Sequence, residues 1–180
     1  MIRRIFIFVL ICSSLQAFDA IAQDFIVTKS GDTINGVMNK NLLGKLILKV
    51  TDGQKFEVAL EDVNSYYLAG KRALFIAKQI PKKSKPSYVE VLERGKINLY
   101  EHNVKTPEGV VITNWYANKD SDVLEDIITS QLFSKVKPRE ELFMKLISDN
   151  DALLAAYKLE KKYNFGVKRN YIKAYNLAIR

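Results

Sequence analysis

The chain has 180 residues, of which 48% are hydrophobic and 27% charged, and its formal net charge at pH 7 is +8. It holds one cysteine and one histidine, Cys12 and His102. This composition excludes a disulfide within the chain, a structural metal site built from several thiolates, and a zinc site built from several histidines.

The first 22 residues have the layout of an export signal. A pair of arginines precedes an almost wholly apolar run over residues 5–15, shorter than the about 20 apolar residues that a membrane-spanning helix needs. Ala20 and Ala22 are small side chains of the kind that a signal peptidase accepts, so we predict cleavage between Ala22 and Gln23. We expect the exported chain in the periplasm or at the outer membrane or cell surface, without a transmembrane helix. The alternatives are a retained membrane anchor and a buried strand.

Cleavage there leaves residues 23–180, a length that suits one domain or a domain with an appendage. The positive charge is concentrated in residues 135–180, which hold eleven Lys or Arg against five Asp or Glu. Such a segment attracts anionic partners such as lipid headgroups or acidic glycans, while export removes most nucleic acid from the list. The alternative is that these lysines coat the outer faces of short helices and keep the protein soluble.

Residues 24–117 are predicted to form strands, because apolar and polar residues alternate there between turn signals. Ser30-Gly31-Asp32 and Thr51-Asp52-Gly53-Gln54 are typical hairpin turns. The loop over residues 81–86 has prolines at both ends and three lysines between them, so we expect it to interrupt the sheet and to mark a possible subdivision. The predicted strands cover residues 25–29, 33–38, 45–50, 55–60, 63–68, 72–80, 88–93, 97–101 and 110–117.

The apolar period then changes from 2 to about 3.6, which predicts a helical segment over residues 123–180 packed on the β-rich region of residues 23–122. One apolar stripe follows Pro138, a second follows the capping residues 149–151, and a third contains Tyr171, Ile172 and Tyr175. The pattern over residues 123–134 leaves open whether that stretch is a strand leading into a helix or a helix throughout.

Three stretches resemble a group of small exported Gram-negative bacterial proteins of unassigned function. They are residues 23–36 (QDFIVTKSGDTING), 91–100 (VLERGKINLY), and the ending from 148–154 (SDNDALL) to 172–176 (IKAYN). The resemblance implies the compartment and the layout, and it implies no activity or catalytic residue. Residues 31–63 are in addition similar to the strand pattern of small SH3-like or Sm-like barrels, a fold that hosts many functions.

No sequence motif for catalysis or cofactor binding is present, and we predict neither a catalytic residue nor a metal or cofactor site. The acid pairs Glu61-Asp62, Glu140-Glu141 and Asp149/Asp151 would suit a hydrolase only if two of the acids met in one cleft. Candidate contact residues are strand aromatics, which can stack on sugars or peptides, and basic residues of the C-terminal segment. They are Tyr67, Tyr100, Trp115, Tyr116, Lys161, Lys162, Lys168 and Arg169.

The sequence thus predicts an α+β fold, with an antiparallel β meander or partly closed small barrel followed by three helices. The predicted function is a non-enzymatic binding module of the bacterial cell envelope that contacts an envelope protein or an anionic surface polymer. The alternative is a small periplasmic hydrolase or carbohydrate-binding protein that uses an acid pair and the aromatic face around Trp115. The oligomeric state and the identity of the partner stay open.

Overall fold

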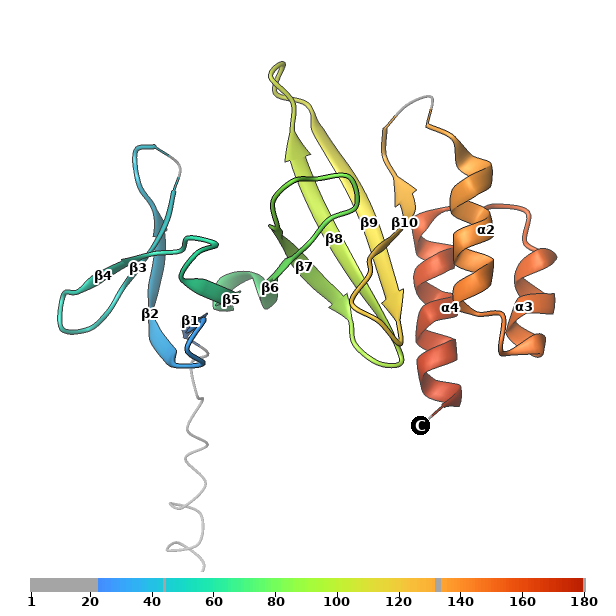
Figure 1. Cartoon of the computed structure of the whole chain (residues 1–180), viewed down its shortest axis with the longest axis horizontal. Helices are drawn as coiled ribbons and strands as arrows, with labels where there is room; N and C mark the ends of the chain where they lie inside the picture. Colours follow the sequence, from blue (N-terminus) through green and yellow to red (C-terminus); the bar gives the residue numbers. More distant parts are fainter. Residues whose placement is uncertain (1–22, 44, 132–133, 180) are drawn as a thin grey trace, which may run out of the picture.

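The computed structural model describes residues 23–43, 45–131 and 134–179 (Figure 1). The predicted export signal, residues 1–22, lies outside the described residues, and so its cleavage after Ala22 stays a prediction. The α+β fold is confirmed, and it consists of one ten-stranded antiparallel sheet that does not close into a barrel, followed by three helices.

The strands follow the period-2 pattern of the sequence closely, and most of their ends fall at the glycine, proline and aspartate turns. A short 3₁₀ helix, η2 (Ala69–Lys71), connects β5 to β6. The strands are β1 (Asp24–Thr28), β2 (Thr33–Lys40), β3 (Leu46–Lys49), β4 (Lys55–Glu57), β5 (Val63–Leu68), β6 (Ala73–Lys78), β7 (Ser87–Glu93), β8 (Ile97–Lys105), β9 (Val111–Lys119) and β10 (Glu125–Thr129).

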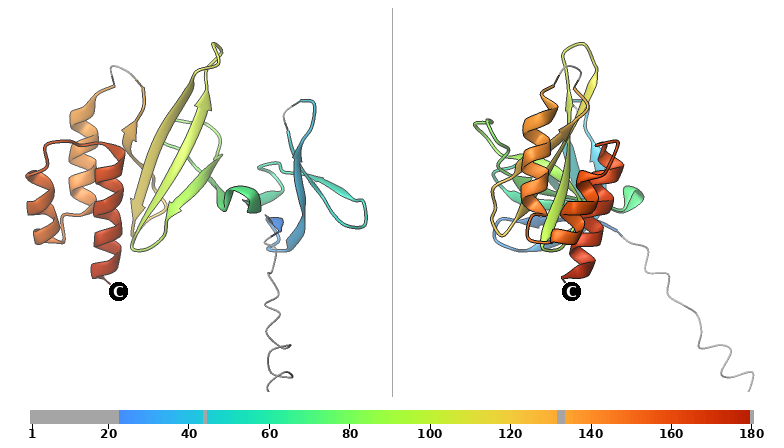
Figure 2. Two further views of the ribbon diagram at one scale, coloured as in Figure 1. Left: turned by 180° about the vertical axis from the view of Figure 1, so that it is seen from behind. Right: turned by 90° about the vertical axis from the view of Figure 1, so that its right-hand side faces the viewer.

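The strand order is β10-β9-β8-β7-β6-β5-β1-β2-β3-β4. Consecutive strands pair with each other throughout, except for β4 and β5, because β5 pairs with β1 instead. The sheet therefore joins two groups of strands, which are well separated in the left view of Figure 2, through the pairing of β5 with β6 and of β6 with β7.

The first group of strands has a small core of its own. Ile26 of β1, Leu48 of β3 and Val63 of β5 are buried there, and Tyr66 and Tyr88 pack against them. The hydroxyl of Tyr88 donates hydrogen bonds to the carbonyl oxygens of Ala59 and Val63, at 3.1 Å and 2.8 Å. A strand of the second group thereby fastens the loop before β5.

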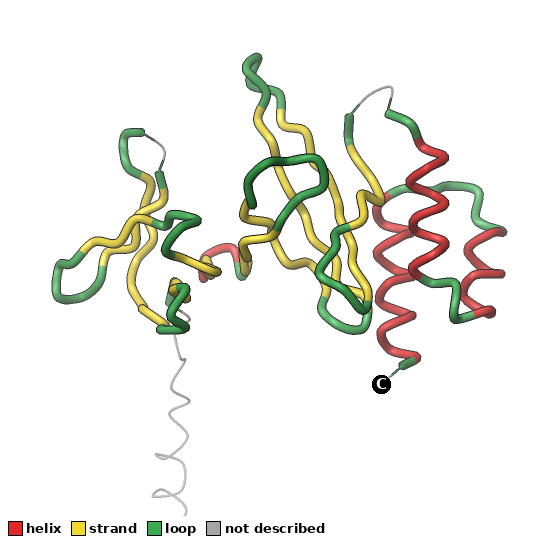
Figure 3. Tube along the Cα trace, in the orientation of Figure 1, coloured by secondary structure: helices red, strands yellow, loops and turns green. Residues whose placement is uncertain are grey.

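Three helices pack on one face of β8, β9 and β10: α2 (Val136–Leu146), α3 (Asp151–Lys158) and α4 (Phe165–Ala178). Figure 3 shows them at the end of the sheet that β10 forms. Asn150 and Asn164 cap α3 and α4, their side chains accepting hydrogen bonds from the backbone N–H groups of Leu153 and Val167. The core between the helices and the sheet contains Ile97, Leu99, Ala117, Ile127, Phe143, Leu146, Ile147, Tyr157, Ile172 and Tyr175.

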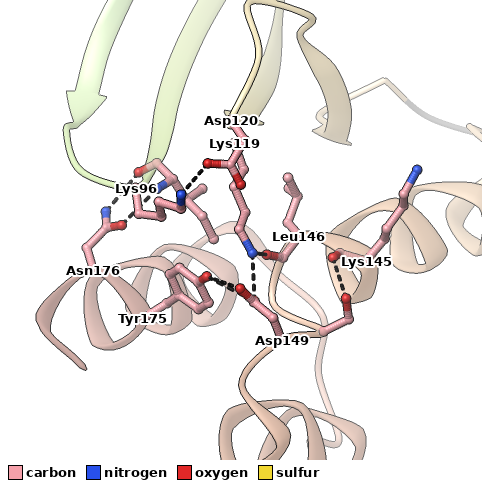
Figure 4. A network of polar contacts seen from close by, with 10 residues as sticks. Lys96, Lys119, Asp120, Lys145, Leu146, Asp149, Tyr175 and Asn176 are labelled. Atoms are coloured by element: carbon pink, nitrogen blue, oxygen red, sulfur yellow. Dashed lines mark hydrogen bonds and ion pairs between the residues drawn. The ribbon is translucent and has the colours of Figure 1, made fainter. Parts of the chain in front are cut away.

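Polar contacts fasten α4 and the α2–α3 connection to the β8–β9 end of the sheet (Figure 4). The ammonium group of Lys119 lies 2.6 Å from Asp149 Oδ1, and the hydroxyl of Tyr175 donates to the same carboxylate. Asn176 of α4 bonds both main-chain groups of Ile97, and Lys96 pairs with Asp120. These contacts tie chain segments that are about 25 to 80 residues apart.

The opposite face of the sheet has a third core, in which Val89, Tyr100, Tyr116 and Leu124 are buried beside Ile80. Tyr100 belongs to this core while Leu99 belongs to the helix-side core, because successive side chains of a strand point to opposite faces. Among the described helices, none is long and apolar enough to cross a membrane.

The structure defines two segments whose secondary structure the sequence pattern did not fix. Residues 123–134, left open between strand and helix, contain the strand β10, so the sheet continues into the segment expected to be helical. The stretch Asn164-Phe165-Gly166 lies between the second and third apolar stripes of the sequence, and α4 begins within it, at Phe165. Asn164 is a helix-capping residue, and its side-chain oxygen replaces the missing main-chain acceptor at the start of α4.

Candidate binding groove

A groove runs between the edge strand β10 and the helices α2 and α4. It consists of two cavities of about 300 Å³ and about 580 Å³, and Ser134 and Arg139 line both of them. β10 is an edge strand that pairs only with β9, and its residues line both cavities. An open strand edge beside a helix is a place where a partner can be accommodated.

The smaller cavity has an aromatic wall. Trp115 of β9 stacks on Phe165 of α4, with ring centroids 4.5 Å apart and planes inclined by 22°. Tyr163, from the loop before α4, is 41% exposed and completes the wall. Ile128 and Val136 add aliphatic surface, so the cavity offers an apolar interior about the size of one large side chain or one sugar ring.

Local sequence features place these aromatic rings. Trp115 stands opposite Ile128 in the β9–β10 register, and it faces the helices because it alternates along β9 with Tyr116, which belongs to the core on the opposite face. The Asn164 cap sets the first turn of α4, so that Phe165 meets Trp115. The indole N–H of Trp115 donates to Glu101 Oε2 at 2.9 Å and thereby fixes the orientation of the ring.

A buried ion pair lies behind the cavity. Lys168 is fully buried, and its ammonium group lies 2.7 Å from Glu140 Oε1 and 2.7 Å from the carbonyl oxygen of Ile127 in β10. The hydroxyl of Tyr157 donates to the other oxygen of Glu140 at 2.5 Å. Burial lowers the pKa of Lys168 although Glu140 opposes this, and burial together with the Glu140 hydrogen bond raises the pKa of Tyr157. The network connects α2, α3, α4 and the edge strand.

A second ion pair separates the two cavities. The guanidinium group of Arg139 in α2 bonds both carboxylate oxygens of Asp126 in β10, at 2.9 Å and 2.7 Å. The hydrogen bonds to Asp126 raise the pKa of Arg139. The larger cavity on the far side is bordered by Tyr116, whose pKa is raised by burial and by Asp126, and by Lys82 of the lysine loop.

The structure brings several of the predicted contact residues to this groove. Trp115 and Tyr116 line its two cavities, Lys168 lies behind it, and Arg169 packs over the ring of Phe165 at 6.0 Å. Lys168, expected as a surface charge, is therefore part of the buried interior. The side chain of Arg169 is half-buried and pairs with Glu93 at 2.6 Å.

The other predicted contact residues lie elsewhere. Tyr100 is buried in the core on the opposite face, and Tyr67 stacks on Phe25 in the first group of strands, with ring centroids 5.3 Å apart. Lys161 and Lys162 are exposed in the loop between α3 and α4.

One further pair of acids is not evident from the sequence, because its two members are eleven residues apart in the chain and meet only through strand pairing. Glu90 of β7 and Glu101 of β8 are directly opposite in the sheet register, and Phe75 and Trp115 stand beside them in the same row. Burial and, second, the nearby Glu101 carboxylate raise the pKa of Glu90. Of the acids predicted as pairs, Glu140 and Asp149 instead hold Lys168 and Lys119.

The described residues contain no group of three or more His, Cys, Asp or Glu side chains placed to hold a metal ion. Comparisons of the chain with protein-family models, with curated proteins and with solved structures gave no match.

Proposed function

We propose that this chain is an exported, non-enzymatic binding module of a bacterial cell envelope, and that it holds a segment of another envelope protein in the groove between β10 and the helices. The aromatic cavity carries the proposal. Three rings from β9, from α4 and from the loop before it line one small apolar space beside a strand edge. Mostly apolar cavities with a few polar groups at the rim are typical binding sites.

The apolar lining of the smaller cavity and the adjoining edge strand favour a protein segment as the ligand. The smaller cavity, of about 300 Å³, accommodates one large apolar side chain, and the hydroxyls of Ser130 and Ser134 border it. The larger cavity continues in the direction of β10 and carries both basic and acidic groups, among them Lys135 and Glu125. An extended segment would place an apolar anchor in the first cavity and polar residues in the second.

Residues 1–22 support export through their sequence pattern alone. The basic C-terminal region would add electrostatic attraction for an acidic partner. Its contribution comes from exposed residues such as Lys161 and Lys162, since Lys168 is paired in the interior.

A photo-crosslinking residue at the rim of the groove tests the proposal. It replaces Tyr163 in the cells that produce the chain, and the control places it at Leu159, which is 82% exposed at the end of α3. We expect one dominant crosslinked protein from position 163 and none from position 159. Crosslinks of equal pattern from both positions would contradict a specific groove.

A variant that fills the aromatic cavity provides a second test in the same crosslinking experiment. Val136, the first residue of α2, is 60% exposed and lines the aromatic cavity, so Val136→Trp should occupy the space without disturbing the core. Leu177→Trp, at a 66% exposed site near the end of α4, is the matched control. We expect the first variant to abolish the crosslink and the second to retain it.

The opposed carboxylates of Glu90 and Glu101 favour a second candidate function, hydrolysis or binding of a carbohydrate. Directly opposed residues of an antiparallel pair have Cβ atoms roughly 4.5–5.5 Å apart, which suits the close carboxylates of a retaining glycosidase. Release of reducing ends from purified peptidoglycan tests it. Activity that Glu101→Gln abolishes would replace the binding module by an enzyme, and activity retained in that variant would assign it to a contaminant.

A further inference from the structure

The hairpin between β2 and β3 presents two leucines to solvent. Leu42 is fully exposed and Leu43 is 83% exposed, the highest values among the large hydrophobic side chains of the described residues. The side-chain oxygen of Asn41 accepts hydrogen bonds from the backbone N–H groups of Leu43 and Lys45, at 3.0 Å and 2.9 Å. Asn41 therefore holds the backbone of Leu43 and Lys45 in place, and the side chains of Leu42 and Leu43 are exposed to solvent.

Lysines line the hairpin behind this tip, from Lys40 at the base of the tip to Lys49 and Lys55 at the far end of β3. The outer face of the hairpin has a hollow of about 560 Å³ whose lining includes Lys40, Lys49 and Lys55. Lys49 and Lys55 are directly opposite in the β3–β4 register, an arrangement of like charges that weakens a sheet in isolation. The one acid in the hollow, Glu57, is already paired with Lys45 at 2.7 Å.

No carboxylate of the described residues lies within ion-pair distance of Lys40, Lys49 or Lys55. The hairpin thus combines an apolar tip with uncompensated positive charge along its length, nearest the tip at Lys40 and farthest from it at Lys49 and Lys55. This is the distribution that suits a membrane surface, where apolar side chains enter the acyl region and lysines meet anionic headgroups.

We propose that the β2–β3 hairpin docks on an anionic lipid bilayer, with Leu42 and Leu43 inserted and the lysine hollow against the headgroups. The hairpin lies at the opposite end of the sheet from the groove of β10, as Figure 1 shows. Membrane attachment therefore leaves the groove free for its own ligand, and the two sites are tested separately.

A fluorescent label at the tip tests insertion directly. The chain from Gln23 onward contains every strand and helix described above and has no cysteine, so Leu43→Cys provides a single attachment site for an environment-sensitive dye. With vesicles of phosphatidylglycerol and phosphatidylethanolamine, we expect a blue shift and a rise in emission. The same dye at Leu159→Cys should show neither, and an unchanged spectrum at position 43 would overturn the proposal.

Vesicle sedimentation measures the energetic contribution of each part. Burial of a leucine changes a partition coefficient at least on the order of ten-fold, so Leu42→Ser/Leu43→Ser should lower vesicle binding by about 100-fold. Leu159→Ser/Leu177→Ser removes two exposed leucines elsewhere and should leave binding unchanged. Equal losses in both double variants would contradict docking through the hairpin tip, provided that circular dichroism shows both variants folded.

Charge reversal tests the lysine hollow. Each lysine near an anionic surface contributes roughly five-fold to binding, so Lys49→Glu/Lys55→Glu should lower binding at least about 25-fold and weaken its dependence on salt. Lys161→Glu/Lys162→Glu, at the other end of the molecule, is the matched control. Binding of the unaltered chain to phosphatidylcholine vesicles with equal strength would refute the role of the lysines, and unaltered binding by the hairpin variant would do the same.

Discussion

The side chain of Asn176 bonds both main-chain groups of Ile97, as a neighbouring strand would. Its Oδ1 accepts from the N–H of Ile97 at 2.9 Å, and its Nδ2 donates to the carbonyl oxygen of Ile97 at 2.8 Å. Helix α4 thereby caps the start of β8. Gly95 lies directly beneath this amide, where a Cβ atom would collide with it.

We therefore expect Gly95→Ala to displace Asn176 and to lower the free energy of unfolding by about 1–3 kcal/mol, because the buried main-chain groups of Ile97 lose their partners. Urea denaturation measures this. Asn176→Ala should have a similar effect, and the double variant should cost little more than either single one. Additive losses would show that Gly95 acts independently of Asn176.

The buried pair of Lys168 and Glu140 predicts an asymmetric response to substitution. Lys168→Met leaves Glu140 charged in the interior and should cost about 3–5 kcal/mol of unfolding free energy. Glu140→Gln in the same chain removes that charge, so the double variant should regain part of the loss. Chemical denaturation of the three variants forms a double-mutant cycle, and a double variant less stable than Lys168→Met would contradict the expected coupling.

His102 should make the protein less stable in mild acid. Burial, with Lys83 nearby, lowers the pKa of His102 from 6.5 to about 4, and its Nδ1 is buried without a hydrogen-bond partner. Because the unfolded chain takes up a proton that the folded chain refuses, the free energy of unfolding should fall as the pH drops from 6.5 toward 4. Below the folded pKa this contribution no longer changes.

The variant His102→Phe tests this origin. It should stay within about 1.5 kcal/mol of the unaltered chain at pH 7, because the change conserves shape and removes an unpaired polar atom. Its stability should vary less between pH 6.5 and 4 than that of the unaltered chain. Identical pH profiles of the two proteins, measured by urea denaturation, would assign the acid sensitivity to other groups.

The contact between Lys119 and Asp149 gives a different pH signature. The hydrogen bonds from Lys119 and Tyr175 lower the pKa of Asp149 below 3.8. Burial lowers the pKa of Lys119, but the bonds to Asp149 and Tyr175 outweigh it and raise that pKa above 10.5. The stabilisation is therefore complete between about pH 4 and 10, is lost in acid as Asp149 is protonated, and is lost in base as Lys119 is deprotonated.

Asp149→Asn should lower the melting temperature near pH 7 by about 2–4 °C, the shift that about 1 kcal/mol produces in a protein of this size. The difference from the unaltered chain should shrink below pH 3. Asp151→Asn, two residues further on in the first turn of α3, is the matched control and should change little. A pH-independent difference would rule out the ion pair as its cause.

Local patterns were sufficient to predict most of the strands and all three helices. The alternation of Leu46, Leu48 and Val50 with lysines reflects one buried and one exposed face, and this information is contained in a few neighbouring residues. The pairing of β1 with β5 was not predictable in this way, because it joins segments almost 40 residues apart. The strand character of β10 was obscured by the bulge near Ile127, which breaks the period-2 pattern.

The site was predictable in part. Trp115 was identified as a contact candidate, but its stacking on Phe165 depends on tertiary packing between segments 50 residues apart. The burial of Lys168 has a local signal in the sequence, since Lys168, Ile172 and Tyr175 share one face of α4 at spacings of four and three. A charge on an apolar stripe indicates a buried partner, and that partner, Glu140, lies on another helix.

The position of β1 has a consequence for how the chain folds. Eight of the nine strand pairings join consecutive strands, and these pairings require only short loops to close. The pairing of β1 with β5 is the exception, because it can form only after the chain between them has been brought into place. The segment from β2 to β4 therefore forms an excursion of the chain: it leaves the sheet position of β1 and returns as β5, which pairs with β1. Apart from the pairing of β2 with β1, the strand pairings of this excursion are made within it, so a longer or shorter turn between β3 and β4 leaves the register of the other strands unaltered.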